Sequence, residues 1–291
     1  MCKEIIDSDY KKKGDRGTQY ESVGGYEIMC KKKLYLGTNT KMYKTISDTL
    51  EYLDRLNLLT ADITGDDLEL FVIPSFTSLE SAGKLLEDSR ILLGAQNMGW
   101  EESGQFTGEI SPIMLKEVRT DIVEIGHSER RHTFGETDQQ ENLKVKCALK
   151  HGFKALFCIG ETFEQKNFGL SDEVLSTQLK IGLHGISAEQ AENLWLAYEP
   201  VWAIGVDGVP ATKEYAAAKH RTIRNVLCRL FGDVTGNSIP ILYGGSVNNL
   251  NAKELMGMPE IDGLFIGRSA WNAENFNKII RMVYPLWRAS N

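Results

Sequence analysis

Short apolar runs recur along the chain at regular intervals from residue 34 onward. Most are continuous rather than alternating, which is typical of strands that are covered on both faces. Each run ends in glycine or polar residues, and the runs occupy residues 34–39, 70–75, 91–97, 121–128, 154–161, 194–200, 240–246 and 263–269. The pattern therefore predicts a series of buried parallel strands.

Segments with apolar residues at helical spacing separate these runs. The clearest is 212–231, where Thr212 is a candidate N-cap. We expect similar helices near 45–58, 77–88, 139–151, 172–184, 249–257 and 273–286. About eight strand–helix units close a parallel barrel, so we predict an α/β protein with a single (β/α)8 barrel. The alternative is an open doubly wound sheet, although GTNTK at 37–41 is not the glycine-rich loop usual in that fold.

Residues 1–28 do not follow this pattern. The segment is polar and charged, and it lacks the apolar core of a signal peptide. We predict that 1–28 is a flexible N-terminal extension and that 29–291 is the barrel domain, with Met29 as an alternative start.

The composition narrows the function classes. The 33 Lys and Arg residues against 40 Asp and Glu residues give a net charge of −7, which does not favour nucleic acid or an anionic membrane as a partner. No apolar run is long enough to span a bilayer. The five cysteines (Cys2, Cys30, Cys147, Cys158 and Cys228) form no CxxC pair, so we expect reduced thiols in a cytoplasmic protein.

Catalytic groups of such barrels lie at the C-terminal ends of the strands. The residues at or just after the ends of the runs are Asn39, Lys41, His127, Ser128, Glu129, Glu199, Gly244, Gly245, Ser246, Gly267 and Arg268. The spacing in GHSERRHTFGE (126–136) fits no standard zinc pattern, so we expect no metal.

Each candidate has a functional and a structural interpretation. Desolvated beside Val201 and Trp202, Glu199 would be a strong base, or else an ion-paired strand-end glutamate. His127 precedes SERRH, whose helix start would favour a neutral imidazole that donates a hydrogen bond, but it could be a structural histidine. Lys41 could hold an anion or simply be solvated. The turns YGGS and IGR could offer backbone N–H groups to a phosphate, or be turns only.

Six motifs lie across residues 34–290; in chain order they are LYLGTNTKM, GAQNMGWEESGQFTGEISPIML, GHSERR, FCIGET, AYEPVWAIG and YGGSV. Together they strongly resemble triosephosphate isomerase. The resemblance implies an aldose–ketose isomerase of glycolysis and gluconeogenesis that interconverts dihydroxyacetone phosphate and glyceraldehyde 3-phosphate without cofactor or metal. It also implies a homodimer in which loop 96–111, with Thr107 near its tip, inserts beside the partner's Asn–Lys pair.

The resemblance also implies roles for single residues. Glu199 would be the base that moves a proton through an enediolate, and His127 the neutral electrophile. Asn39 and Lys41 would steady the enediolate, with Glu129 as the partner of Lys41. The positions that match the phosphate site are Gly205, Gly244, Gly245, Ser246, Gly267 and Arg268. A lid would begin at Pro200 and Trp202, end at the hinge 210–212, and close over the phosphate to exclude water.

Three departures leave the substrate open. The lid segment IGVDGVPAT is one residue longer than is usual in the family, Arg268 replaces the second glycine of a pair, and Thr40 replaces an aromatic residue. A branch of the family with GRSAW and the longer lid isomerises four-carbon erythrulose phosphates in sugar-alcohol catabolism, so this substrate is the alternative. Two other classes are a Schiff-base enzyme that uses Lys41 and a non-catalytic phosphosugar-binding protein.

Overall fold

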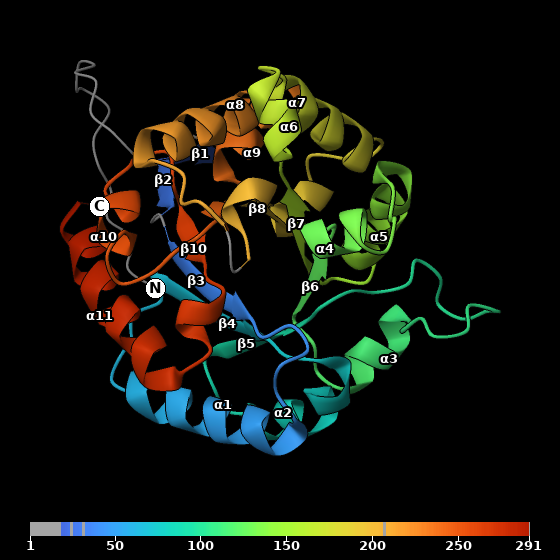
Figure 1. Ribbon diagram of the computed structural model, residues 1–291, viewed down its shortest axis with the longest axis vertical. Coiled ribbons are helices and arrows are strands. Elements are labelled where there is room, and N and C mark those ends of the chain that lie inside the picture. Colours follow the sequence, from blue (N-terminus) through green and yellow to red (C-terminus); the bar gives the residue numbers. More distant parts are fainter. Residues whose placement is uncertain (1–18, 24–25, 31–32, 206–207, 291) are drawn as a thin grey trace.

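The computed structural model describes residues 19–23, 26–30, 33–205 and 208–290 of the chain. Eight parallel strands form a closed barrel in the order β10, β3, β4, β5, β6, β7, β8, β9 (Figure 1). They are β3 (Leu34–Asn39), β4 (Leu68–Ile73), β5 (Ile91–Ala95), β6 (Ile122–Ile125), β7 (Lys154–Ile159), β8 (Leu194–Tyr198), β9 (Ile241–Tyr243) and β10 (Gly263–Phe265). Because β10 pairs with both β9 and β3, the barrel has no open edge. The predicted (β/α)8 barrel is confirmed, and the open-sheet alternative is wrong.

Helices surround the barrel on its outer side (Figure 1). Threonine side chains begin several of them, and the predicted cap Thr212 accepts a hydrogen bond from the backbone N–H of Tyr215. The α-helices are α1 (Ile46–Thr60), α2 (Leu79–Leu85), α3 (Pro112–Glu117), α4 (Ser128–His132), α5 (Asp138–Lys150), α6 (Phe163–Asn167), α7 (Ser171–Gly182), α8 (Lys213–Phe231), α9 (Asp233–Ser238), α10 (Ala252–Met256) and α11 (Ala273–Ser290). The 3-10 turns are η1 (Phe76–Ser78), η2 (Gln190–Asn193), η3 (Val201–Ala203) and η4 (Arg268–Ala270).

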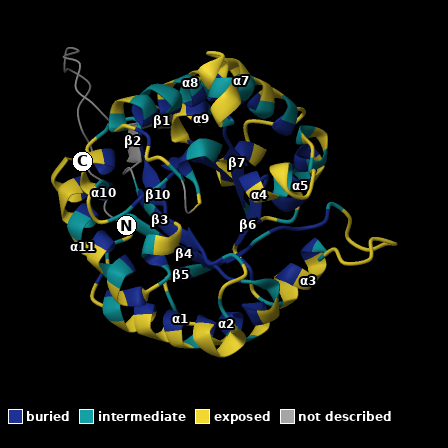
Figure 2. Ribbon diagram, in the orientation of Figure 1, coloured by how far each residue is buried: buried dark blue, intermediate teal, exposed yellow. Residues whose placement is uncertain are grey.

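The barrel interior is a packed core. The ring centroids of Tyr35 on β3 and Trp195 on β8 lie 4.9 Å apart, although these strands are not neighbours. Phe71 on β4 and Phe265 on β10 stack at 5.7 Å. A second apolar layer lies between the strands and the helices, whose buried residues face inward (Figure 2). The site must therefore lie at an end of the barrel, because side chains fill its interior.

The strand boundaries differ from the prediction in one consistent way. Seven of the eight predicted runs extend two to four residues beyond the C-terminal end of the observed strand. The extra residues leave the sheet and form the loops that carry the candidate site. The helices α3, α6 and α9 were not predicted, because a helix of five or six residues has too few turns to show a period.

The N-terminal segment is described only in part. Residues 1–18 and 24–25 of the predicted extension lie outside the described residues. The strands β1 (Gln19–Val23) and β2 (Tyr26–Cys30) form an antiparallel pair that the sequence pattern did not predict. The boundary of the barrel domain at residue 29 stays a prediction.

Two further observations concern the setting of the protein. None of the helices in the described ranges combines the length and the apolar character needed to cross a membrane. Cys147, Cys158 and Cys228 are free thiols. The cytoplasmic location stays a prediction.

Candidate active site

Glu199 directly follows β8 and is 3% exposed. Its backbone N–H donates to the carbonyl of Ile159 at 2.8 Å, which fixes the main chain where the strand ends. Gly244, at the end of β9, leaves room for the side chain, because a Cβ atom there would lie 2.8 Å from Glu199 Cγ. Glu199 Oε2 is buried and has no hydrogen-bond partner in the part of the chain that is described. An unpaired buried carboxylate oxygen is costly, and it is a frequent sign of a functional group.

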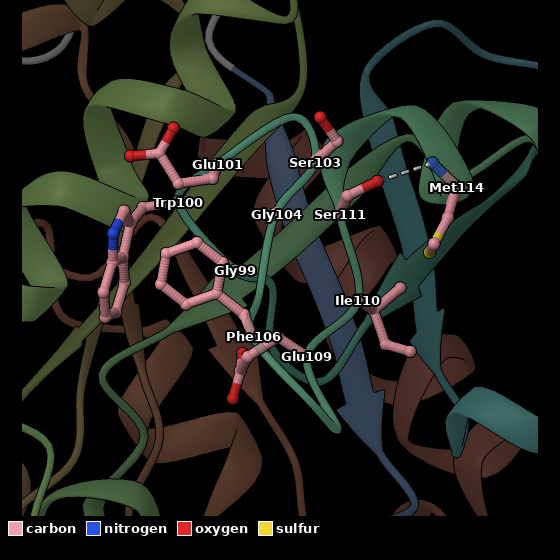
Figure 3. A pocket seen from close by; sticks show the side chains of 10 residues that line it. All are labelled: Gly99, Trp100, Glu101, Ser103, Gly104, Phe106, Glu109, Ile110, Ser111 and Met114. Atoms are coloured by element: carbon pink, nitrogen blue, oxygen red, sulfur yellow. Dashed lines mark hydrogen bonds between the residues drawn. The ribbon is translucent and has the colours of Figure 1, made fainter.

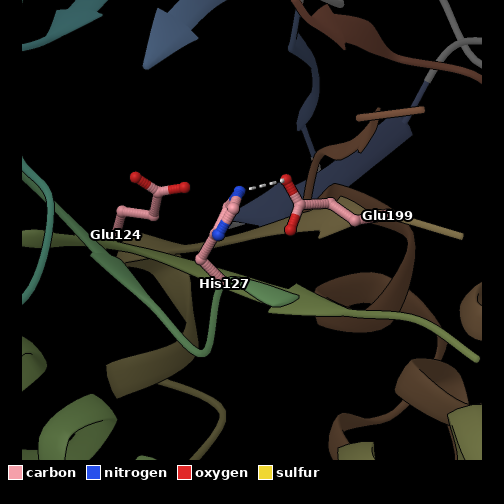
Figure 4. A group of neighbouring side chains, drawn as sticks. All are labelled: Glu124, His127 and Glu199. Carbon is pink, nitrogen blue, oxygen red and sulfur yellow. Dashed lines mark ion pairs between the residues drawn. The ribbon is translucent and has the colours of Figure 1, made fainter. Parts of the chain in front are cut away.

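His127 lies between Glu199 and the start of α4. Its Nδ1 accepts a hydrogen bond from the backbone N–H of Glu129 at 3.1 Å. This bond requires a lone pair on Nδ1, so in the neutral ring the proton is on Nε2. The Nε2 atom lies 3.7 Å from Glu199 Oε1 (Figure 4). This tautomer makes Nε2–H of His127 a hydrogen-bond donor, and the role of His127 as the neutral electrophile stays a prediction.

Asn39 is the last residue of β3, and Lys41 lies in the turn that follows it. Lys41 Nζ pairs with Glu129 Oε1 at 2.6 Å, and the backbone N–H of Lys41 donates to Asn39 Oδ1 at 2.6 Å. Lys41 has φ +51°, a conformation that costs energy for a residue with a Cβ atom. Gln96 Nε2 donates to the carbonyl of Lys41 at 2.7 Å, and Trp271 Nε1 donates to that of Asn39 at 2.8 Å. These bonds hold the strained turn in place.

The predicted phosphate residues lie on the loops after β8, β9 and β10, which are consecutive around the barrel. Among the described residues, Arg268 forms no ion pair with a carboxylate. Its Nη2 donates to the carbonyl of Gly205 at 2.8 Å and so joins the loop after β10 to the first part of the predicted lid. Gly205 has φ +91°, which favours glycine, and its surroundings leave open space. Ser246 accepts a hydrogen bond on its carbonyl from Asn251 Nδ2 at 2.8 Å.

Comparison with known proteins identifies the family of this chain. Residues 34–283 match the family model described as triosephosphate isomerase. The chain belongs to the triosephosphate isomerase family.

Two relatives with the same enzyme name and one solved structure are similar to this chain. The chain is 49% identical over 252 residues to the L-erythrulose-1-phosphate isomerase of Rhizobium etli, covering 86% of this chain and 92% of that protein. It is 46% identical over 257 residues to the enzyme of the same name from Rhizobium meliloti, covering 88% and 98%. A crystal structure of triosephosphate isomerase from Bartonella henselae superposes with a TM-score of 0.78 at 35% identity, covering 87% and 99%. The chain is an isomerase, so the predicted enzyme class is confirmed.

Glu124 is the residue of this isomerase that sequence reasoning missed. It lies within β6, three residues before His127, and is fully buried. Its Oε2 accepts a hydrogen bond from Asn39 Nδ2 at 2.6 Å. Burial, and then the charge of Glu199, raise the pKa of the Glu124 carboxyl well above its usual range, while Lys41 opposes the effect. A carboxylate inside the apolar run DIVEI was the signal that could have revealed it.

Glu161 joins the first residues of the predicted lid to the barrel. Its buried carboxylate accepts hydrogen bonds from Tyr198 Oη at 3.1 Å, Trp202 Nε1 at 3.0 Å and Tyr215 Oη at 2.8 Å. The backbone N–H of Val201 donates to the Glu161 carbonyl at 3.0 Å. One carboxylate thus holds β8, the predicted first hinge and helix α8 together. The predicted lid also includes residues 206–207, which lie outside the described residues.

Three side chains could be considered as ligands for a metal ion. Glu124, His127 and Glu199 each place one donor atom within 4.8 Å of the others (Figure 4). However, Glu124 Oε2 already accepts a hydrogen bond from Asn39 Nδ2. The hydrogen bond from the Glu129 N–H to His127 Nδ1 leaves the ring proton on Nε2, the nitrogen that faces Glu199. Binding a metal would first require removal of that proton. The expectation that the isomerase needs no metal stays a prediction.

Loop 96–111 extends away from the barrel between β5 and α3 (Figure 1). Within the loop, the rings of Trp100 and Phe106 pack edge to face at 5.8 Å (Figure 3). Residues of the loop, with Met114 of α3, line a cavity of about 70 Å³. Phe106 is 44% exposed, and Ile113 and Met114 on α3 are 53% and 54% exposed. These exposed apolar residues suit a protein interface.

Proposed function

We propose that this isomerase acts on a four-carbon ketose phosphate of the L-erythrulose 1-phosphate type. Two relatives with this name support the four-carbon substrate. They are 46–49% identical to this chain, and the matches span 92–98% of their length. The triose phosphates expected from the family resemblance are supported at family level only. Triose phosphates are therefore the second candidate, and with them the role in glycolysis.

The chemistry follows from the structure of the substrate. In L-erythrulose 1-phosphate the C2 carbonyl lies between the phosphate-bearing C1 and the hydroxyl-bearing C3. Transfer of the C3 hydrogen to C2, together with transfer of the C3 hydroxyl proton to the C2 oxygen, moves the carbonyl to C3. The product is erythrulose 4-phosphate when numbered from the other end. Both compounds are ketoses, so the aldose–ketose description applies only to triose substrates.

In the proposed mechanism Glu199 takes the proton from C3 and returns it to C2. Its buried position, with Oε2 unpaired and Oε1 3.7 Å from His127 Nε2, is the observation that carries this proposal. Nε2–H of His127 would exchange protons with the two substrate oxygens. Lys41 and Asn39 would stabilise the enediolate, since a fixed cation and amide placed where charge develops lower the barrier.

The phosphate would lie over the loops after β8, β9 and β10, among Gly205, Ser246, Gly267 and Arg268. Lid closure over it would keep water from the enediolate, which otherwise eliminates phosphate. Because the Lys41 ammonium is paired with Glu129 at 2.6 Å, a Schiff base at Lys41 is not supported. We also propose a homodimer formed through loop 96–111, whose exposed Phe106 would be covered by the partner.

The test is kcat/KM on L- and D-erythrulose phosphates beside dihydroxyacetone phosphate and glyceraldehyde 3-phosphate. Glu199→Gln is the blank, because it keeps the shape of the side chain and removes the base. A preference for an erythrulose phosphate of at least about tenfold is the expected result. A preference for the triose phosphates by orders of magnitude would return the protein to the second candidate.

A further inference from the structure

Glu124 is a second buried carboxyl group at the proposed active site, beside Glu199, and the proposed mechanism does not use it. Its partners come from two other strands of the barrel. Oε2 accepts from Asn39 Nδ2 on β3, and the Sγ of Cys158 on β7 lies 3.8 Å from Oε1. One Glu124 oxygen lies within 4.8 Å of donor atoms on both His127 and Glu199. Figure 4 shows the imidazole of His127 between the two carboxyl groups.

The surroundings of Glu124 contain too few cations to balance negative charges on both Glu124 and Glu199. The side chain is 0% exposed, so water does not stabilise a charge on it. The titratable and charged groups that face it are Glu199, Lys41, Glu129, Cys158 and His127. Among them, Lys41 is already paired with Glu129 at 2.6 Å, and His127 is arranged as a neutral ring. Two carboxyl groups this close in a buried site do not both ionise at neutral pH.

We propose that Glu124 is a positioning residue that works as a neutral carboxylic acid: it orients the amide of Asn39 toward the substrate and leaves Glu199 as the single anion of the buried pair. Because no solvent reaches Glu124, it acts through its neighbours rather than by contact with substrate. The Asn39 side chain is held at both ends, by Glu124 at Nδ2 and by the Lys41 N–H at Oδ1. The second Nδ2 hydrogen of Asn39 is then available for the enediolate.

The proposal has a consequence for pH dependence. Ionisation of Glu124 at alkaline pH would place a second negative charge beside the enediolate that forms in the reaction. Because two close, buried carboxyl groups do not both ionise at neutral pH, we expect this loss above neutral pH, and the direction of the Glu124 pKa, raised by burial and by the charge of Glu199, agrees. The wild-type kcat should therefore fall over the range in which Glu124 loses its proton.

The experiment compares Glu124→Gln with Glu124→Leu in the full-length protein. Glutamine reproduces the neutral acid and its acceptor oxygen, so kcat at pH 7 should stay within about threefold of wild type. Leucine has a similar size but offers no acceptor to Asn39, so kcat should fall about tenfold with little change in KM. In Glu124→Gln, kcat should also stay level over the alkaline range in which the wild-type value falls.

Infrared difference spectra observe the proton without turnover. The spectrum of wild type minus Glu124→Gln at pH 8 should contain the C=O stretching band of a protonated carboxylic acid, and this band should titrate together with the fall in kcat. Glu141→Gln is the matched control, because Glu141 is also a buried glutamate, with a pKa raised to about 7, and lies outside the proposed site. That variant should leave the activity profile unchanged.

Two results would overturn the proposal: no protonated-acid band for Glu124 at pH 8, or a Glu124→Gln profile identical to that of wild type. The inference rests on the proposed function, since it assigns a role at that site. The two fail differently. If the band is present but no phosphosugar is isomerised, the proposed function fails while the charge state of Glu124 stands. If wild type is active and both variants match it at every pH, only the role of Glu124 is wrong.

Discussion

Replacement of Glu141 by glutamine should stabilise the protein at pH 8 and have little effect near pH 4.5. Glu141 lies on α5 and is 0% exposed. Burial raises the pKa of its carboxyl from 4.5 to about 7; Arg131 and Lys144 oppose the effect, and the neighbouring Glu136 adds to it. The difference between 4.5 and about 7 corresponds to about 3 kcal/mol.

The sign follows from the two pKa values. Below pH 4.5 the folded and unfolded chains both hold the Glu141 proton, so the group does not affect the free energy of unfolding. Between pH 4.5 and about 7 the unfolded chain loses the proton first, and stability falls as the pH rises. Above about pH 7 the folded protein carries the full cost of a buried anion. Glutamine cannot ionise, so Glu141→Gln should avoid this cost.

The assay is thermal unfolding of wild type and Glu141→Gln at pH 5 and pH 8. For a domain of this size, about 3 kcal/mol corresponds to a rise in Tm of roughly 5–10 °C at pH 8, with a much smaller rise at pH 5. Glu136→Gln is the control. Arg130 and Lys144 hold the pKa of the Glu136 carboxyl at about 2 despite its burial. Its removal should lower Tm at both pH values, since it leaves two cations without their partner.

The reasoning would be refuted if Glu141→Gln raised Tm equally at pH 5 and pH 8, since a gain that does not depend on pH would come from packing. A loss of stability at pH 8 would also refute it, because it would show that the ionised carboxylate is favourable in the folded state.

Three further predictions concern the site and the loops. Arg268→Ala removes the hydrogen bond to the Gly205 carbonyl and should lower kcat/KM about fivefold. The loss should be equal for three- and four-carbon substrates, because the bond lies at the phosphate end of the proposed site. A changed substrate preference would contradict this. Gly244→Ala places a Cβ atom 2.8 Å from Glu199 Cγ and so displaces the base. In steady-state assays kcat should fall up to about 100-fold with KM nearly constant. An unchanged kcat would show that the base tolerates displacement. Phe106→Asp puts a charge on a side chain that is 44% exposed, and analytical ultracentrifugation at micromolar concentration should then show monomers, whereas an intact dimer would place the interface elsewhere.

Much of the fold can be predicted from the sequence because each barrel strand is covered on both faces. Such strands appear as continuous apolar runs, and the run Leu34–Asn39 matches β3 at both ends. Polar residues at or just after the ends of the runs include Glu199, His127 and Lys41, so the candidates could be named before the structure was known. Local patterns do not give their partners, and the Lys41–Glu129 pair was expected from the family resemblance only. The acceptor for Arg268, for example, is a main-chain carbonyl 63 positions away.

The sequence by itself determined the order and type of the strands and the residues at their ends, because both depend on local patterns of apolar and polar side chains. Only the tertiary structure decided which of these residues meet. Closure of the barrel through β10 and β3 places the ends of β3, β6 and β8 around one mouth, so that Asn39, Glu124 and Glu199 interact across 75 or more positions of sequence. The raised pKa of Glu124 is a property of this shared, buried space. No local pattern encodes it, since it depends on how many anions and cations the closed barrel brings together.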